Sequence, residues 1–577
     1  MESQTTGNSG FDANTWQPSH NVWLIAFSVM LATFIEVLDT SVATVSLPHI
    51  AGNLSATNDE ATWILTSYLI SNAIVLPSSS WLSSRLGRKR YQLLSVSIFT
   101  LASMLCGAAT SLGMLIAARV LQGAAGGGLQ PVSQAVLLES FPVQKRGQAM
   151  AAYGMGIIVS PLIGPLLGGW ITDNYSWRWI FYINVPIGIL ALLMINAFVE
   201  DPPYLARTVG KKIDTIGFGL MAIAFTALQV VLDKGQEADW FGAIWVRWFL
   251  AVAAAALVIF IIRELNTPEP IVNLRILVNR NLATGTFMIG LLGVIIYGTT
   301  AILPLFLQEL MGYDAFKSGY AVAPRGIGAI LSMLIAARLI GRVDERLLIA
   351  IGILIRGGSL FMLGNLNFSM SMSTIIWPNI VNGFANGFLF VPLTTLTMKT
   401  LPRELTGAGT GIYNLLRNLG ASLGISMVTT MLVRGEQAHQ DVLVTYLNSG
   451  NPPYWNALQR LSRFLAIQGG NAEGTHLAMG ALYRNLVRQA SLCSYIDDFR
   501  LLGILSVSCL PFLLFFHNVK QEKKPRRGVT RYSATGPGPS QPRLPLPSRN
   551  PRSPEKPFPS LTPLSAPRRA APSSLHP

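Results

Sequence analysis

The sequence predicts an all-α polytopic membrane protein with fourteen transmembrane helices. Only 12% of its 577 residues are charged, whereas soluble proteins average about 25%. The mean hydropathy is +0.43. Apolar runs long enough to cross a bilayer, about 20 residues each, recur from Trp23 almost to the C-terminal tail. These observations exclude a soluble globular domain with a single anchor.

Hydropathy over a window of about 19 residues places the helices in order along the chain. The expected spans are 23–46, 62–80, 91–110, 113–135, 148–170, 178–199, 214–232, 244–262, 283–308, 318–338, 347–365, 374–396, 408–432 and 500–518. Short loops are expected between most of them. The longest polar interruption is the segment 434–499.

The distribution of Lys and Arg predicts that both termini are cytoplasmic. With the N-terminus inside, the short internal loops and their borders hold seventeen Lys and Arg residues, and the external ones hold four. This asymmetry is the positive-inside pattern. Residues 1–22 then form a cytoplasmic N-terminus. Residues 519–577 form a cytoplasmic tail that is expected to be disordered, because it is rich in Pro, Ser and Arg.

The same orientation makes the polar segment 434–499 external. Within it, Leu458, Leu461 and Leu465 have the spacing of a short amphipathic helix. Such a helix either lies against the external face of the protein or packs within the segment itself. The sequence leaves both arrangements open.

The composition and motifs of the chain exclude several other classes of protein. The net charge of +15 comes from basic residues between spans and in the tail, so no nucleic-acid partner is expected. The three cysteines lack metal-ligand spacing, and neither a His-Glu-x-x-His motif nor a phosphate-binding loop is present. We therefore expect no metal, no cofactor and no direct use of ATP.

Charged residues inside apolar spans are the strongest functional signal. Glu36 and Asp39 stand three apart in the first span, so they share one face of a helix. Arg119 is a cation inside the span 113–135. Ionised groups are costly within a membrane and need partners. Each acid is therefore either a static polar group satisfied by a neighbouring helix or a group that carries protons.

The loop after the second span carries a recognisable motif. Residues 80–89 read Ser-Trp-Leu-Ser-Ser-Arg-Leu-Gly-Arg-Lys, which resembles the Gly-x-x-x-Asp-Arg-x-Gly-Arg-Lys signature of the major facilitator superfamily. The matching residues include Arg85, Gly87 and Arg88, and the departures are Ser80 and Ser84. Residues 341–346 resemble a degraded second copy, as expected for a protein with two related halves.

Two further stretches extend the resemblance. Residues 119–128 resemble the Arg-x-x-Gln-Gly element of the superfamily, and residues 160–169 resemble its Gly-Pro-x-x-Gly-Gly antiporter motif. The small and bending residues of the antiporter motif are Gly164, Pro165, Gly168 and Gly169. Glycines let helices approach closely, and prolines bend them. Within the superfamily this motif marks exporters rather than importers.

Other features narrow the resemblance to the EmrB/QacA type of drug:proton antiporter. They are Leu38-Asp39-Thr40, residues 417–424, the two extra helices in the middle of the chain and the long external segment. The resemblance covers residues 23–518. It implies a major facilitator fold with six-helix halves at 23–199 and 283–518, separated by two inserted helices and a linker within 200–282.

The resemblance also implies a function. It is proton-coupled efflux of small amphipathic drugs or toxic compounds across the cytoplasmic (inner) membrane, by alternating access. Asp39 is the first expected proton carrier, Glu36 the second, and Arg119 the modulator. A facilitator-type importer of a small metabolite is the alternative. A membrane-embedded enzyme is a third reading, for which the sequence offers no catalytic constellation.

Polar residues in other spans are expected to shape the substrate path. Gln130, Asn382, Asn386 and Arg417 are expected to line the cavity, while Arg325 and Arg356 either line the path or pair internally. The expected partners are a small-molecule substrate, protons and the lipid bilayer. The resemblance adds a periplasmic adaptor protein that contacts residues 434–499.

Overall fold

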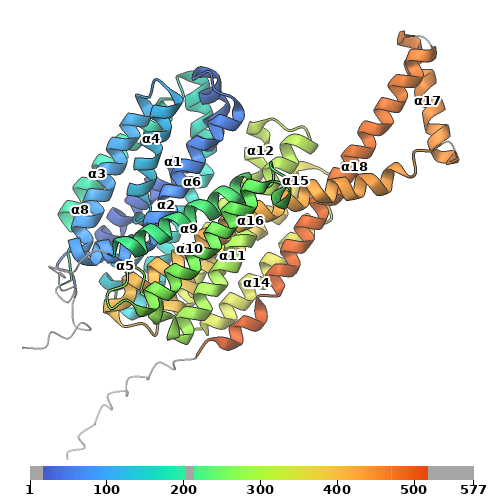
Figure 1. The fold of residues 1–577 in the computed structure, drawn as a ribbon. Helices are drawn as coiled ribbons and strands as arrows, with labels where there is room; N and C mark the ends of the chain where they lie inside the picture. The colour runs from blue at the N-terminus through green and yellow to red at the C-terminus, as the bar shows by residue number, and fades with distance from the viewer. Residues whose placement is uncertain (1–16, 203–213, 449, 470, 518–577) are drawn as a thin grey trace, which may run out of the picture. The chain divides into compact units, whose positions relative to one another are not determined.

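The computed structural model describes residues 17–202, 214–448, 450–469 and 471–517. Its α-helices are α1 (Val22–Asn53), α2 (Asn58–Leu86), α3 (Arg88–Gly107), α4 (Leu112–Gly126), α5 (Leu129–Ser140), α6 (Arg146–Asn174), α7 (Trp179–Tyr182), α8 (Asn184–Phe198), α9 (Thr215–Lys234), α10 (Ile244–Asn266), α11 (Arg280–Leu305), α12 (Ala315–Val322), α13 (Pro324–Leu339), α14 (Glu345–Leu363), α15 (Met372–Met398), α16 (Thr406–Val444), α17 (Pro452–Gly469) and α18 (Asn471–Val507). The expected all-α class is confirmed (Figure 1). The predicted tail 519–577 and most of the N-terminus 1–22 lie outside the described residues.

The N-terminal half, α1 to α8, packs through close helix pairs. Helix α1 packs against α6, α2 against α4, and α3 against α8. Glycines make the α2–α4 approach close: a Cβ atom on Gly123 or Gly127 would run into the α2 backbone at Tyr68 or Asn72. Two predicted spans are each divided into two helices, α4 with α5 and α7 with α8.

The C-terminal half contains α11 to α16 and the end of α18. Its helices pack in pairs that include α11 with α16, α13 with α15, and α14 with both α15 and α18. Gly420 and Gly424 of α16 lie against the backbone of α11 at Gly290 and Val294. This small-x-x-x-small spacing lets two helices approach without side chains between them.

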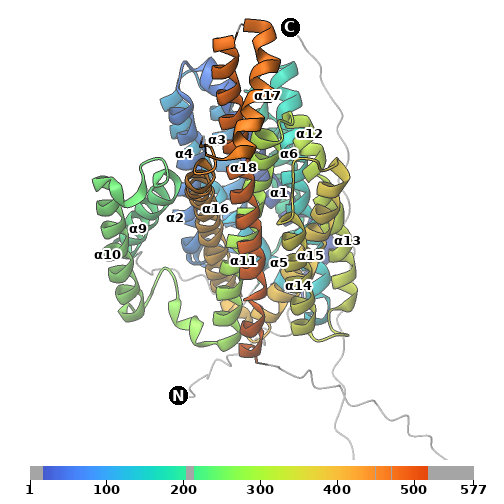
Figure 2. The same cartoon turned by 90° about the vertical axis from the view of Figure 1, so that its right-hand side faces the viewer.

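The inserted helices α9 and α10 attach at the seam between the halves. Helix α9 packs against α2 of the first half and α16 of the second, while α10 packs against α9 (Figure 2). At the base of this hairpin, Arg263 of α10 donates hydrogen bonds to Asp214, the N-cap of α9, at 2.8–3.0 Å. These hydrogen bonds hold the pKa of the Asp214 carboxyl below its ordinary value.

Most described residues of the segment 434–499 are helical, which corrects the expected external loop. Helix α16 continues to Val444, and α18 runs from Asn471 into the last predicted span. A helix of 39 residues extends about 58 Å, well beyond a hydrocarbon core of about 30 Å. Helix α17 packs against α18 and projects with it from the bundle (Figure 1). Of the two open arrangements, packing within the segment is therefore the one observed.

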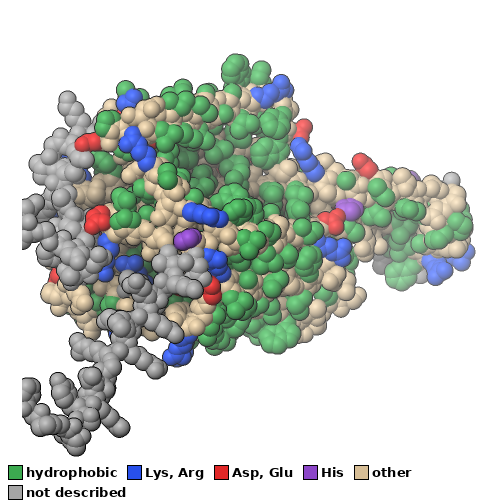
Figure 3. All heavy atoms as spheres, turned by 90° about the horizontal axis from the view of Figure 1, so that it is seen from below, with side chains coloured by type: hydrophobic (Ala, Val, Ile, Leu, Met, Phe, Trp, Pro, Cys, Tyr) green, Lys and Arg blue, Asp and Glu red, His purple; other side chains and the backbone are tan. Residues whose placement is uncertain are grey.

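The surface suits a multi-pass membrane protein. Among the described residues, twelve helical stretches are long and apolar enough to cross a membrane, and each matches a predicted span. The other two predicted spans, 91–110 and 148–170, correspond to α3 and α6, which are not among the twelve. Large apolar side chains such as Ile244, Trp248 and Ile262 of α10 are exposed, as lipid-facing residues are. Figure 3 shows hydrophobic side chains over much of one face, with charged side chains scattered between them.

Candidate functional site

Asp39 of α1 lies at the centre of a buried polar network formed with α4 and α8. The side chain of Arg119 forms an ion pair with Asp39 Oδ2, and the two residues are 0% and 2% exposed. Gln122 Nε2 and Asn184 Nδ2 donate to Asp39 Oδ1 at 2.9 Å and 2.7 Å. Three donors, one of them cationic, thus satisfy a carboxylate that would otherwise be very costly to bury.

Arg119 has contacts beyond the ion pair. Its Nε donates to the Ile64 carbonyl oxygen at 3.1 Å, and its Nη1 donates to Gln122 Oε1 at 2.8 Å. The guanidinium carbon lies 4.3 Å from the centre of the Tyr68 ring, in the geometry of a cation–π contact. Among the described residues Asp39 is the only acid paired with Arg119. Protonation of Asp39 would therefore leave this cation without a paired counter-charge.

Glu36 lies one turn before Asp39 and connects the two halves of the protein. Asn72 Nδ2 and Gln130 Nε2 donate to its carboxylate at 3.3 Å and 2.7 Å. The other end of the Gln130 amide accepts a hydrogen bond from Arg417. Gln130 belongs to α5 and Arg417 to α16, so the chain of contacts Glu36–Gln130–Arg417 crosses from one half to the other.

The charges of Glu36 and Arg417, which lie on either side of Gln130, fix the orientation of its side-chain amide. A guanidinium can only donate hydrogen bonds, so the Gln130 carbonyl faces Arg417 and its NH₂ group faces Glu36. Among the described residues, neutral amides alone donate to Glu36, whereas Asp39 contacts a cation directly. Protonation of Glu36 thus breaks no ion pair within the described part of the chain, whereas protonation of Asp39 does.

The antiporter motif packs on the turn of α1 that follows Asp39. A Cβ atom on Gly164 would overlap the Ser41 side chain, and one on Gly168 would lie 3.1 Å from the Val42 carbonyl oxygen. Gly169 faces open space, and the side chain of Pro165 lies outside the described ones. Two of the four predicted motif residues thus hold α6 directly against the α1 segment that carries the acids.

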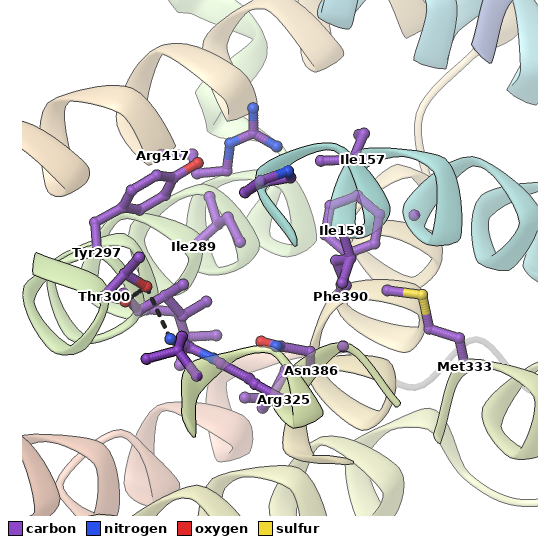
Figure 4. Close-up of a pocket in the computed structure, with 17 residues that line it drawn as sticks. Ile157, Ile158, Ile289, Tyr297, Thr300, Arg325, Met333, Asn386, Phe390 and Arg417 are labelled. Carbon is purple, nitrogen blue, oxygen red and sulfur yellow. Dashed lines mark hydrogen bonds between the residues drawn. The ribbon is translucent and has the colours of Figure 1, made fainter. Parts of the chain in front are cut away.

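A cavity of about 260 Å³ lies between the halves (Figure 4). Helix α6 supplies one wall, and α11, α12, α13, α15 and α16 supply the rest. Two of the four residues expected to line it do so, namely Asn386 and Arg417. Gln130 and Asn382 do not, because Gln130 is held between Glu36 and Arg417, and Asn382 by Arg356 and Ser359.

The remaining predicted cations in the C-terminal half are close to this cavity. Arg325 lines it and donates to Thr300 at 2.9 Å. Arg356 is 0% exposed and donates to Asn382 at 3.3 Å and to Asn386. Amide and hydroxyl oxygens, rather than carboxylates, are thus their hydrogen-bond acceptors among the described residues.

The motif after the second span forms a turn that needs its glycine. Gly87 has φ +90°, and Asp201 occupies the space that a Cβ atom would fill. The next residue, Arg88, is buried and pairs with Glu139 at 2.6 Å. Arg85 lies over the Trp81 ring, 5.3 Å from its centre. The superfamily's usual Asp is absent at Ser84, and in this chain Asp201 accepts a hydrogen bond from the Lys89 backbone at the turn.

A similar turn lies at the corresponding place in the second half. Gly341, between α13 and α14, has φ +83°, as expected if residues 341–346 are a second copy of the motif. Glu345, the first residue of α14, pairs at 3.0 Å with Lys399, which follows α15. The charges are reversed relative to the Arg88–Glu139 pair.

Sequence reasoning missed several residues that complete these networks. Gln122 and Asn184 bind Asp39, Asn72 binds Glu36, and Glu139 pairs with Arg88. Three of them are polar residues within predicted spans, which was the available signal. Among the described residues, no group of three or more His, Cys, Asp or Glu side chains could hold a metal ion.

Comparisons with known proteins agree with this architecture. The model of the Major Facilitator Superfamily matches residues 29–425. Over 430 residues the chain is 38% identical to the multidrug export protein EmrB of Escherichia coli (strain K12), which covers 74% of this chain and 84% of that protein.

A second relative and a solved structure extend the match. The probable multidrug resistance protein EmrY of the same strain is 33% identical over 478 residues, covering 82% of this chain and 93% of its own. The solved structure of the proton:xylose symporter XylE has a TM-score of 0.56 at 14% identity and covers 86% of this chain and 95% of that one. At that identity the structural match concerns the fold alone.

Proposed function

Because this chain belongs to the major facilitator superfamily, and within it to the EmrB-type transporters, we propose that it exports small amphipathic drugs or toxic compounds in exchange for protons. The cavity between the halves is the substrate site. Alternating access moves the halves about this site so that it opens to one side of the membrane at a time.

The observation that carries the proposal is the buried Asp39–Arg119 pair beside the antiporter motif. A proton and Arg119 compete for the same carboxylate. When a proton from outside binds Asp39, Arg119 loses its counter-charge, and the packing of α1 against α4 changes. When Asp39 releases the proton inside, the ion pair forms again. Arg119 is thus the modulator of the proton site.

Glu36 connects this proton site to the cavity. It lies three residues from Asp39, and Gln130 links it to Arg417, which lines the cavity. A drug that displaces Arg417 from Gln130 changes the hydrogen bonding of Glu36, so drug binding in the cavity and the acids of α1 are linked. We assign Glu36 the coupling to substrate and Asp39 the proton that crosses the membrane.

Export can be tested with purified protein in liposomes of uniform orientation. With the vesicle interior acidic and its cytoplasmic face outward, the protein should concentrate amphipathic dyes inside, and collapse of the pH gradient should stop accumulation. An importer would instead take up a small metabolite in the physiological inward direction. Dye accumulation that is the same with and without the pH gradient would contradict proton coupling.

We also propose a cytoplasmic-membrane location with both termini inside. The protruding hairpin, defined as α17 with the part of α18 paired to it, is then external. By analogy with EmrB-like exporters, it is the contact for a periplasmic adaptor protein. Its projection beyond the bundle supports this role (Figure 1).

Single cysteines test this topology. In a background with serine at Cys106, Cys493 and Cys509, Val442→Cys should react with a membrane-impermeant maleimide in intact cells. Arg90→Cys should react only after permeabilisation. Both positions are exposed, so differences in labelling report the side of the membrane. Labelling of Arg90→Cys from outside would reverse the orientation.

A further inference from the structure

The charged groups of the cavity lining are all cationic. Of the 17 lining residues that Figure 4 draws, Arg325 and Arg417 are charged, and no Asp or Glu is among them. Most of the others are aliphatic or aromatic, for example Ile157, Ile289 and Phe390. Arg417 is already engaged by Gln130, and through it by Glu36. Within the part of the chain that the structure describes, the one hydrogen-bond acceptor of Arg325 is the neutral hydroxyl of Thr300.

A third cation, Arg356, lies behind the residues that line the cavity. Arg356 is fully buried and has no ion-pair partner among the described residues. Its Nε lacks a hydrogen-bond partner, and its other nitrogens donate to Asn382 and Asn386. By contrast, the equally buried Arg88 and Arg119 both pair with acids. Burial of a cation without an acidic partner costs free energy. The lack of an acid beside Arg356 among the described residues therefore calls for a functional explanation.

Arg356 also determines what Asn386 offers to the cavity. Because the guanidinium can only donate, the Asn386 carbonyl must face Arg356. The Asn386 NH₂ group is then free to donate elsewhere, and Asn386 lines the cavity. The wall formed by α13 and α15 thus presents a guanidinium and an amide NH₂ group to the cavity, with a second positive charge behind them.

We propose that Arg325, Asn386 and Arg356 form an anion-binding subsite of the cavity. It takes the acidic group, a carboxylate or sulfonate, of a monoanionic amphipathic compound whose apolar body lies against the aliphatic and aromatic wall. Arg325 and Asn386 contact the anion, and Arg356 orients Asn386 and adds positive potential. The role in transport rests on the proposed function, but the binding preference does not.

Three probes with one aromatic body test the subsite. They are naphthalene-1-sulfonate, the neutral naphthalene-1-sulfonamide and the cationic 1-naphthylmethylammonium, each titrated into the full-length protein in nanodiscs by calorimetry. The sulfonate should bind about tenfold more tightly than the sulfonamide, as expected for hydrogen bonds to a charged group. The cation should bind most weakly.

Variants separate the subsite from general packing. Arg325→Gln and Arg356→Gln should each weaken sulfonate binding by about tenfold and leave sulfonamide binding within about twofold of the parent. The control is Arg338→Gln, which removes an exposed charge from the same helix as Arg325. It should change neither sulfonate binding nor sulfonamide binding. Arg356→Gln should not lower the unfolding temperature, because it removes a buried charge that has no ion-pair partner.

The outcomes distinguish this proposal from the proposed function. Equal loss of sulfonate and sulfonamide binding, unchanged sulfonate binding, or a preference for the cation would each overturn the subsite. Dye export in liposomes is measured alongside. Absence of export by a parent protein that prefers the sulfonate contradicts the proposed function alone. Export by a protein without that preference contradicts the subsite alone.

Discussion

Asp39→Asn is expected to abolish proton-driven drug accumulation while the protein still binds drug. Asparagine keeps the size of the side chain and can still receive hydrogen bonds from Gln122 and Asn184, but it cannot exchange a proton at neutral pH. The cavity lies outside this network, so drug affinity should be close to that of the parent. Accumulation in liposomes under an imposed pH gradient measures the loss.

Three further variants test whether the loss of accumulation is specific to the proton site at Asp39. Asp39→Glu keeps a proton site and should retain partial activity. Glu36→Gln should reduce export less than Asp39→Asn does, because the ion pair of Asp39 with Arg119 and the hydrogen bond of Arg417 to Gln130 both remain. Asp173→Asn, at an acid whose side chain is 69% exposed, should export normally. Full activity of Asp39→Asn with none in Glu36→Gln would reverse the two assignments.

Arg119→Ala should have the second largest effect, because it leaves Asp39 buried without a cation. Loss of one partner of a buried pair costs about 3–5 kcal/mol, and the contact with the Tyr68 ring is lost as well. We expect a protein that inserts into the membrane, unfolds at a lower temperature and does not export. Thermal unfolding in detergent and dye export in liposomes measure the two effects.

A double variant separates the electrostatic effect of this change from its effect on packing. In Arg119→Met combined with Asp39→Asn neither charge remains, and methionine fills much of the arginine volume. Stability should recover toward that of the parent, whereas proton-driven export should not. If Arg119→Ala alone exports normally, the ion pair has no part in transport.

The sequence predicted twelve transmembrane helices that the described residues confirm, because the cost of burying the backbone in lipid forces each span to be a long apolar helix. It also identified Glu36, Asp39 and Arg119, because charges inside apolar spans are conspicuous. Their pairing depends on which helices are neighbours and on how each is rotated. A hydropathy profile gives neither the neighbours of a helix nor its rotation. Gln122 and Asn184 were therefore not predicted as partners of Asp39.

The missing information on helix neighbours and rotation also explains why Gln130 and Asn382 do not line the cavity as expected. Gln130 and Asn382 are polar residues inside spans, as cavity residues are, but each is held between neighbours on other helices. The polar composition of the segment 434–499 favours an external loop rather than long helices. Polarity determines whether a helix can lie in lipid, but it does not determine whether a helix forms. The projecting part of α18 was therefore not predicted.

The most direct test of the central claim is the proton movement that drug produces. Liposomes containing the protein enclose a pH-sensitive dye, and a drug gradient is applied without any initial pH difference. The account predicts that drug flowing through the parent protein drives protons in the opposite direction, and that Asp39→Asn abolishes this flux although it still binds drug. Undiminished drug-driven proton flux through Asp39→Asn would contradict the assignment of the transported proton to Asp39.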